Sequence, residues 1–533
     1  MKAFQYITGI IIYLLCMQAC SKDNIGESGK NPYQDTVLPA ILISKGGVVP
    51  DKGHMDEEIT IRGKGFKEHQ QELSILFNGQ AASIISVTDS TVKVKVPAFA
   101  STGNITAQVG QQYFFGPFFR VLGPMETDTI YPSSRGADNN IRDIIPLEGN
   151  KYLIVGDFTN YDNANIDGGV NRVARINADG TIDRSFKYGR NTGSPSTVVK
   201  AAALPDGKYL VAGSFASYEG LPYASSITRL YNSGALETVN VTRPSGKVQP
   251  TPAMKGGVSG VINNLHVQQD GKIIVTGFFR YYVKPNYNLV TVNGADSLHL
   301  DSTLVNLLCR LHPDGILDTS YNYDLVNHRG MEGVNGVINK SILLPDGKLL
   351  IAGTFTKYNG AAALRVARIN TDGTLDPTFN TAQGANGPIG EMAIQPDGKI
   401  IITGEFTTYG PQQAPKIARI NTDGTLDGSL QVGVGSNGMI FNVSVMPQGQ
   451  LVLSGYFSRF NSITCNNFLV LNPNGSIHTT YNTNGGISLG TNDVTGGFTK
   501  VLQLPDEHAM LGVGSFTKFD FRQCNRIVKL RYQ

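Results

Sequence analysis

Apolar residues of this chain fall into short runs, and turns that contain glycine separate one run from the next. The run Val92-Lys93-Val94-Lys95-Val96 alternates strictly, which is typical of a strand with one buried and one solvated face. Further along, runs such as Leu349-Leu350-Ile351-Ala352 are apolar throughout, as in strands covered on both sides. The pattern predicts an all-β protein.

A hydrophobic strand that ends in Gly-x-Phe recurs seven times, at intervals of 51 to 76 residues. Self-similarity at such a period is the signature of a repeat architecture. The clearest copy, residues 342–379, has four short β segments joined by Asp-Gly turns. Since one such unit cannot bury both of its faces, we expect radial stacking and predict a seven-bladed β-propeller over residues 123–533. The seven phenylalanines are Phe158, Phe215, Phe279, Phe355, Phe406, Phe457 and Phe516.

The last repeat lacks its fourth segment, because the chain stops after the third. Residues 128–131, just before the first repeat, resemble that missing segment. We expect them to complete the last blade, which would remove an exposed sheet edge.

Residues 38–122 form a separate module of short alternating strands. Ile59-Thr60-Ile61 alternates, and the run 73–77 leads into Asn78-Gly79, a strong hairpin signal. About 85 residues of this pattern predict an immunoglobulin-like β-sandwich.

Both modules resemble known families. The segments ITIRGKGF, FNG, VTDSTVKVKVP and STGNITAQV resemble an IPT/TIG immunoglobulin-like domain, and ARINTDGTLDPTF and QPDGKIIITGEF resemble the delta-60 repeat. The second resemblance implies a β-propeller. The first implies a domain that acts as a spacer, with ligand binding as the alternative.

Residues 1–19 are typical of an export signal, with Lys2 followed by the apolar stretch 10–15. Met17-Gln18-Ala19-Cys20 resembles a bacterial lipobox, which implies lipidation at Cys20. The next residues, 21–24, resemble the signal that brings Bacteroidota lipoproteins to the cell surface, and residues 20–37 are polar like a flexible tether. We therefore expect a membrane-anchored protein exposed on the outer membrane; a cleaved signal peptide without lipid is the alternative.

The net charge and the motifs of the sequence limit the classes of partner, cofactor and reaction that we expect. The net charge is +3 without any run of lysine or arginine, so nucleic acid is not an expected partner. We find no zinc spacing, too few carboxylates per turn for calcium, and no nucleophile or metalloprotease motif, so we predict no cofactor, no metal and no catalytic residue. Two carboxylates brought together by the fold stay open as a route to catalysis.

One position on the innermost strand is polar in every predicted blade, whereas its neighbours are mostly apolar or small. We expect these side chains to surround the central channel. Four cations against one carboxylate would make its opening positive and favour an anionic ligand. A solvated lining without ligand is the alternative. Counting back from each phenylalanine gives Arg142, Lys200, Asn264, Lys340, Glu391, Asn442 and Lys500.

Long insertions fall on one rim of the predicted propeller, which carries the loops from second to third strand and from blade to blade, and function tends to lie on such loops. They are residues 159–171, 238–257, 280–306 and 324–336. The third insertion carries Tyr281, Tyr282, Lys284 and Tyr287, and exposed tyrosines stack on sugars and donate hydrogen bonds. The alternative is a loop that packs its own aromatic residues. Tyr282 also belongs to an aromatic position repeated in every blade, where packing is the simpler explanation.

We expect a surface lipoprotein that binds an extracellular ligand, with a polysaccharide for nutrient uptake favoured and an outer-membrane transporter complex as a partner. This expectation rests on the resemblance to surface glycan-binding lipoproteins, which is an analogy of fold. The alternative is an adhesion module that binds an envelope protein. A polysaccharide lyase or hydrolase is the least favoured hypothesis.

Overall fold

The computed structural model describes residues 41–131, 135–162, 170–187, 193–291, 293–379, 383–488 and 496–533. The predicted signal peptide, the tether and the lipidation site Cys20 lie outside these ranges. Within them the chain is all β, as predicted, apart from one 3-10 turn, η2 (Pro505–Glu507). None of the described residues forms a helix with the length and apolar character needed to cross a membrane.

The N-terminal module is a sandwich of two sheets, ordered β1-β3-β7-β6 and β2-β9-β8-β4-β5. Ile59, Ile61, Val92 and Val94 point into its core, while Lys93 between the two valines is exposed, as the alternation predicted. The strands are β1 (Leu42–Val49), β2 (Lys52–Gly53), β3 (Glu58–Lys64), β4 (Leu73–Phe77), β5 (Gln80–Ala81), β6 (Ser83–Val87), β7 (Thr91–Lys95), β8 (Gly103–Val109) and β9 (Gln112–Val121).

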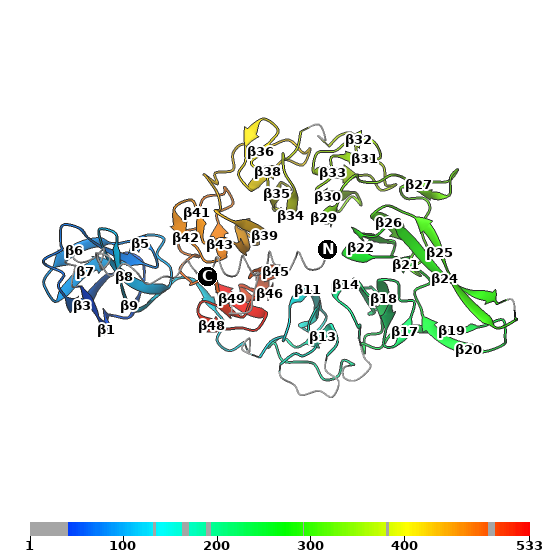
Figure 1. Cartoon of the computed structure of the whole chain (residues 1–533), viewed down its shortest axis with the longest axis horizontal. Helices are drawn as coiled ribbons and strands as arrows, with labels where there is room; N and C mark the ends of the chain where they lie inside the picture. Colours follow the sequence, from blue (N-terminus) through cyan, green and yellow to red (C-terminus); the bar gives the residue numbers. More distant parts are fainter. Residues whose placement is uncertain are drawn as a thin grey trace, which may run out of the picture.

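Seven sheets of one plan follow in the described part of the chain and surround a centre (Figure 1). We number these blades 1 to 7 in chain order. Their first strands are β11 (Ile141–Leu147), β14 (Val198–Ala203), β22 (Val261–Val267), β29 (Ile338–Leu343), β34 (Ile389–Ile394), β39 (Met439–Val445) and β45 (Phe498–Leu504). Their second strands are β12 (Lys151–Gly156), β15 (Tyr209–Gly213), β23 (Ile273–Phe278), β30 (Leu349–Gly353), β35 (Ile400–Gly404), β40 (Leu451–Tyr456) and β46 (Ala509–Gly514). Their third strands are β13 (Val173–Ile176), β18 (Ile227–Leu230), β26 (Leu308–Leu311), β33 (Val366–Ile369), β38 (Ile417–Ile420), β43 (Phe468–Leu471) and β49 (Ile527–Tyr532).

The array closes on itself. Each first strand contacts the first strand of the next blade, and β45 of blade 7 contacts β11 of blade 1. The outer edge of blade 7 is covered by β10 (Met125–Thr127), which pairs antiparallel with β49. The predicted closure is therefore confirmed, although the closing strand begins three residues before the expected segment, at Met125.

In blades 1 to 6 the fourth segment touches the third strand through a single bridge, such as Ile369 to Leu375, and is not an extended strand. In blades 1 to 5 an arginine of the third strand holds this segment in place. In blade 4, Arg368 pairs with Asp376 of its own fourth segment at 2.7 Å and donates to the carbonyl of Thr422 in blade 5 at 2.7 Å. Arg175, Arg229, Arg310 and Arg419 repeat this link between neighbouring blades.

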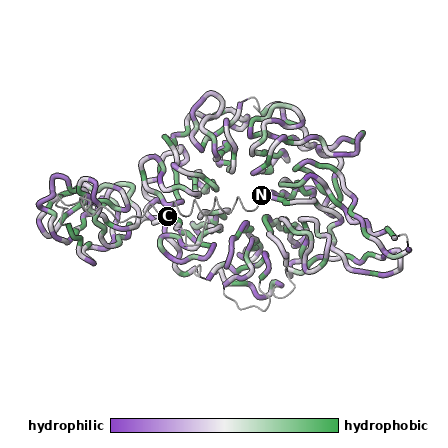
Figure 2. Tube along the Cα trace, viewed as in Figure 1, coloured by the Kyte–Doolittle hydropathy of each residue, from purple (hydrophilic) through white to green (hydrophobic). Residues whose placement is uncertain are grey.

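The Gly-x-Phe motif has a physical explanation in the blades. A Cβ atom on Gly353 would lie 1.8 Å from the carbonyl oxygen of Val337, and the motif glycines of the other blades meet the first strand equally closely. Only glycine permits this approach. The phenylalanine that follows is buried in every blade, and hydrophobic stretches accordingly follow the strands around the ring (Figure 2).

The sandwich packs directly against the ring. The backbone N–H of Thr102 donates to the carbonyl oxygen of Thr483 at 2.8 Å, and the Thr102 hydroxyl donates to the same oxygen at 3.0 Å. The rings of Phe118 and Phe521 meet edge to face with their centroids 5.1 Å apart. The N-terminal domain is therefore fixed to the side of the propeller, next to blade 7 (Figure 1).

Candidate functional site

The first strand of every blade carries a β-bulge, and the residue after the bulge occupies one shared position. This residue pairs with the residue that precedes the motif glycine, as Lys340 does with Ala352. A bulge bends the strand and re-aims a side chain, and such bulges are common near binding sites. We call these residues the channel ring: Asp143, Lys200, Asn264, Lys340, Glu391, Asn442 and Lys500.

Six of the seven predicted positions are therefore in the ring, and Arg142 is not. Arg142 is the bulged residue itself, so its side chain is displaced and forms an ion pair with Asp157 at 2.8 Å. Asp143 takes its place. The ring then holds three lysines and two carboxylates, so the predicted ratio of four cations to one carboxylate was wrong.

All ring residues except Glu391 line a cavity of about 490 Å³ inside the circle of first strands. Lys340 Nζ lies 2.5 Å from Glu391 Oε1, and Lys500 Nζ lies 2.6 Å from Asp143 Oδ1. Lys200 Nζ approaches the same Asp143 oxygen only to 3.9 Å. Each ion pair joins two neighbouring blades, so the charged side chains of the lining link blade 4 to blade 5 and blade 1 to blades 7 and 2.

Burial and the neighbouring charges shape the titration of this network. Burial alone would raise the pKa of the Asp143 carboxyl, but Lys200 and Lys500 outweigh it and lower that pKa, so Asp143 is ionised at neutral pH. Burial, with help from Lys200 and Lys340, lowers the pKa of His266 to about 4. The imidazole of His266 is therefore neutral at pH 7, and its Nε2 lies 2.8 Å from the Ser341 hydroxyl.

The second predicted site lies on two hairpins. Hairpin β19 (Thr238–Thr242) and β20 (Val248–Pro252) belongs to the second insertion, and hairpin β24 (Tyr281–Val290) and β25 (Asp296–Leu304) to the third. The Ser245 hydroxyl donates to Asp296 at 2.5 Å, which joins the tip of one hairpin to the other. The pair extends beyond the outline of the ring (Figure 1).

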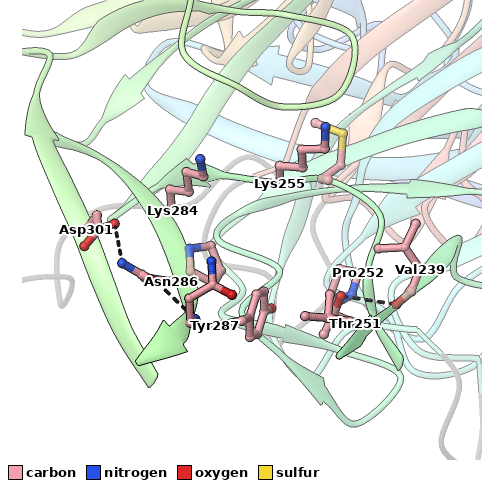
Figure 3. Close-up of a pocket in the computed structure, with 12 residues that line it drawn as sticks. Val239, Thr251, Pro252, Lys255, Lys284, Asn286, Tyr287 and Asp301 are labelled. Atoms are coloured by element: carbon pink, nitrogen blue, oxygen red, sulfur yellow. Dashed lines mark hydrogen bonds between the residues drawn. The ribbon is translucent and has the colours of Figure 1, made fainter. Parts of the chain in front are cut away.

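A pocket of about 420 Å³ opens between these hairpins, and we call it the hairpin pocket (Figure 3). Its apolar lining includes Val239, Pro252 and Pro285, and its polar lining includes Asn286 and Asp301. Asn286 Nδ2 donates to Asp301 Oδ2 at 3.2 Å, which orients the carboxylate. Such a mixture of apolar walls and a few placed polar groups is typical of a small-molecule site.

The structure places the four predicted residues of the third insertion in different surroundings. Lys284 and Tyr287 line the hairpin pocket, and the Arg243 guanidinium lies over the Tyr287 ring, 5.4 Å from its centroid. Tyr281 is 43% exposed but is not part of the lining. Tyr282 is buried and donates its hydroxyl hydrogen to the Gly315 carbonyl at 3.2 Å. Its inclusion in the site is therefore corrected, because its repeated position is a packing position.

Sequence reasoning missed Asp143, His266, Asn286 and Asp301. His266 lies two positions after Asn264 on the same strand, so the strand period alone would have placed it on the channel side. Asn286 and Asp301 depend on the register of β24 with β25, which has an irregularity after Asn286. No pattern in the sequence reveals that register.

The two predicted sites are separate in the structure, because the channel lies at the centre and the hairpins extend away from it (Figure 1). Within the described ranges, no group of three or more His, Cys, Asp or Glu side chains is arranged to hold a metal ion. The channel and the hairpin pocket can each hold a ligand independently of the other. The channel supplies charge, and the hairpin pocket supplies apolar surface with hydrogen-bonding groups.

Family comparisons identify both modules. Residues 46–118 match the IPT/TIG domain model. Five segments match the model described as "Domain of unknown function (DUF5122) beta-propeller", at residues 150–186, 204–238, 344–379, 395–429 and 447–481. A search of curated proteins finds no match.

Solved structures with a detectable likeness include two proteins described as auxiliary nutrient binding proteins. The one from Bacteroides ovatus is 12% identical with a TM-score of 0.29, and the match covers 93% of this chain and 99% of that one. The one from Bacteroides thetaiotaomicron is 10% identical with a TM-score of 0.30, and the match covers 92% and 97%. Likenesses this low say nothing about the ligand of this chain. The chain thus joins a segment that matches the IPT/TIG domain model to five segments of the ring that match the DUF5122 β-propeller model.

Proposed function

We propose that this protein binds an extracellular polysaccharide in the hairpin pocket and serves nutrient uptake at the cell surface. The observation that carries the proposal is the pocket itself. Two insertions that break the repeat symmetry, one after blade 2 and one within blade 3, are braced against each other and enclose it. The pocket requires both insertions, because its lining comes from both hairpins and neither hairpin alone would form it.

The lining matches the chemistry of a sugar ring. Sugars present apolar C–H faces and a rim of hydroxyl groups. Tyr287 and Pro285 offer surfaces for the faces, whereas Asn286 and Asp301 offer acceptors and donors for the hydroxyls. Lys284 adds a cation at the same wall, so a chain with acidic substituents is also compatible.

The cellular setting of the proposal follows from the N-terminal sequence. A lipid at Cys20 would anchor the protein in the outer membrane, since an anchor of two or more chains gives stable attachment. The IPT/TIG domain packs against blade 7, so this domain and the ring would move as one unit at the end of the proposed tether. We propose an outer-membrane transporter complex as the partner that receives the polysaccharide.

Affinity electrophoresis of the purified protein in gels that contain single polysaccharides tests the proposal. We expect retardation by at least one polysaccharide. Replacing Tyr287 with Ala should weaken binding about tenfold, or about 1.4 kcal/mol. Asp301→Asn keeps the size of the side chain and should weaken binding as well. Val248→Ala lies on the same hairpin pair outside the pocket lining and serves as the matched control.

Three results would argue against this function. Retardation that Tyr287→Ala and Asp301→Asn leave unchanged would remove the hairpin pocket from binding. Capture of an envelope protein, with no retardation by any polysaccharide, would favour the adhesion module. New reducing ends or unsaturated products after incubation with the bound polysaccharide would instead indicate an enzyme.

A further inference from the structure

The channel ring contains one cation without a matching anion. Its three lysines face two carboxylates, and His266 is neutral at pH 7. Glu391 is occupied by Lys340, and Asp143 by Lys500. Lys200 lies 3.9 Å from the Asp143 oxygen that Lys500 already holds at 2.6 Å. Among the described residues, the Lys200 ammonium group has no hydrogen bond of its own.

Asp143 has little capacity left for Lys200. Its Oδ1 also accepts from the backbone N–H of Ile144 at 3.1 Å, and its Oδ2 accepts from the N–H of Ala201 at 3.2 Å. The carboxylate is almost fully buried, with 2% of the side chain exposed. The backbone therefore fixes its orientation, and it cannot swing toward Lys200 without losing these bonds.

Asn442 also lines this cavity, and its Nδ2 donates to the Thr499 carbonyl at 3.3 Å. Its Oδ1 has no hydrogen-bond partner among the described residues, but this atom is shielded from solvent, so a ligand in the cavity does not reach it. The accessible unmatched group is therefore the Lys200 ammonium group, which favours an anionic ligand.

We propose that the central channel is a separate site for a small sugar acid, whose carboxylate pairs with the Lys200 ammonium group. The cavity of about 490 Å³ falls in the size range of small-molecule sites and has room for such a ligand. The negative charge of the ligand balances the excess cation. This site does not depend on the hairpin pocket or on the proposed function.

Two sources can supply this chemistry. A sugar acid can enter the channel as a free small molecule, or it can be the terminal acidic residue of a polysaccharide chain. Both place the same carboxylate against Lys200, and the experiment separates them by comparing monomeric galacturonate with polygalacturonate.

The charged groups around Lys200 also predict that ligand binding changes the number of protons bound to the protein. Burial lowers the pKa of Lys200, Lys340 and Lys500 lower it further, and Asp143 and Glu391 oppose them. His266 faces the same space and is neutral. A bound carboxylate adds a negative charge beside the amine and raises this pKa. Above the depressed pKa of Lys200, binding should therefore take up a proton, and affinity should fall as the pH rises.

Isothermal titration calorimetry with galacturonate on the full chain tests the site. We expect galacturonate to bind and galactose, which lacks the carboxylate, not to bind. Lys200→Met keeps the length of the side chain and should weaken galacturonate binding at least tenfold. Lys357→Met, an exposed lysine on blade 4, is the matched control and should change nothing. Titrations in buffers of different ionisation enthalpy should show proton uptake that Lys200→Met abolishes.

Each result of these titrations either supports or contradicts the proposed channel site. If wild type does not bind galacturonate, or if Lys200→Met leaves its affinity unchanged, the site is wrong. Inorganic phosphate that binds as tightly as galacturonate would contradict the assignment of the site to a sugar acid. Binding of polygalacturonate with the same sensitivity to Lys200→Met assigns the chain end as the source, whereas its exclusion assigns the free acid. Tyr287→Ala should leave galacturonate binding intact, which separates this proposal from the function of the hairpin pocket.

Discussion

Arg120 on β9 of the IPT/TIG domain donates to Asp520 of blade 7 at 2.5 Å. Asp520 is largely buried, and its other oxygen accepts from the backbone N–H of Gly485 at 2.7 Å. The ion pair therefore joins the two modules at a carboxylate that the propeller already holds in place. The IPT/TIG domain is a docked part of the molecule and does not hang from a free linker.

Replacing Asp520 with Asn should loosen this docking. The charge-assisted bond to Arg120 is lost, which we expect to cost about 2 kcal/mol. Differential scanning calorimetry should then show the IPT/TIG domain unfolding separately from the propeller. Asp56→Asn removes an exposed ion pair with Lys95 within the same domain and should leave the unfolding profile nearly unchanged. Equal effects of the two variants would contradict a specific role for the Arg120–Asp520 pair.

The link between neighbouring blades predicts a second stability effect. Asp376 is 2% exposed and accepts from both Arg368 and Lys348 at 2.7 Å. Asp376→Asn leaves these cations without their counter-charge, so the free energy of unfolding in urea should fall by about 3 kcal/mol. Asp346→Asn, at an exposed turn of the same blade, should stay within about 0.5 kcal/mol of wild type. A small effect of Asp376→Asn would show that the pairs do not hold the blades together.

Acid should destabilise the propeller through the same carboxyls. Burial opposes their ionisation, but the bonds from lysine, arginine and hydroxyl groups outweigh it and hold the pKa of each well below the ordinary 3.8. Their stabilisation is complete above the unfolded-state pKa and is lost as the pH falls below it. The groups are Asp183, Asp318, Asp376 and Asp427.

Urea titrations between pH 5 and pH 2 measure this loss. Each carboxyl that binds a proton only in the unfolded state contributes about 1.4 kcal/mol per pH unit. The slope should be smaller in Asp376→Asn, because one contribution is gone. An identical slope in the variant would mean that other groups govern the acid response.

The three described cysteines should be inert in the folded protein. Cys309, Cys465 and Cys524 are buried and unpaired within the described ranges. Burial raises the pKa of Cys465 and of Cys524 to about 12 and that of Cys309 still further. We expect maleimide labelling of these positions, mapped by peptide mass spectrometry, only after unfolding. Ser83→Cys, at an exposed position, should label in the folded state. Labelling of Cys309 in native protein would contradict the packed blade 3.

Lipidation at Cys20 is testable in cells of the native type. Metabolic labelling with a palmitate analogue should mark the wild-type protein, and Cys20→Ser should be unlabelled and released from the membrane fraction. Cys309→Ser is the control, since a buried cysteine within the propeller offers no site for an acyl chain. Equal labelling of Cys20→Ser would show that the signal is not a lipobox.

The local patterns of the sequence predict much of the fold, because they follow from strand geometry. The alternation at Val92 and Val94 and the recurring Gly-x-Phe each reflect contacts within one or two strands. Prediction failed where one residue of register decides the outcome. Arg142 and Asp143 are adjacent and both charged, and only the bulge determines which of them faces the channel.

The sites depend on contacts between distant strands, which no local pattern encodes. The pairing of Lys500 with Asp143 joins blade 7 to blade 1, and the hairpin pocket needs Ser245 to meet Asp296. Tyr281 and Tyr282 are adjacent, yet one side chain is exposed and the other is buried, as the repeated aromatic position of Tyr282 suggested. The sequence marks candidate positions, but only the folded arrangement shows which side chains line a cavity.

The pairing of β10 with β49 joins the two ends of the propeller sequence and closes the circle of blades. Arg531 and Asp128, which hold it at 2.8 Å, are 403 positions apart in the sequence. Blade 7 therefore has an open outer edge until β10 and β49 pair, and contacts of such long range form slowly. A chain truncated by a few residues at its C-terminus would leave this sheet edge unpaired. The open edge would tend to pair with a strand of a neighbouring copy.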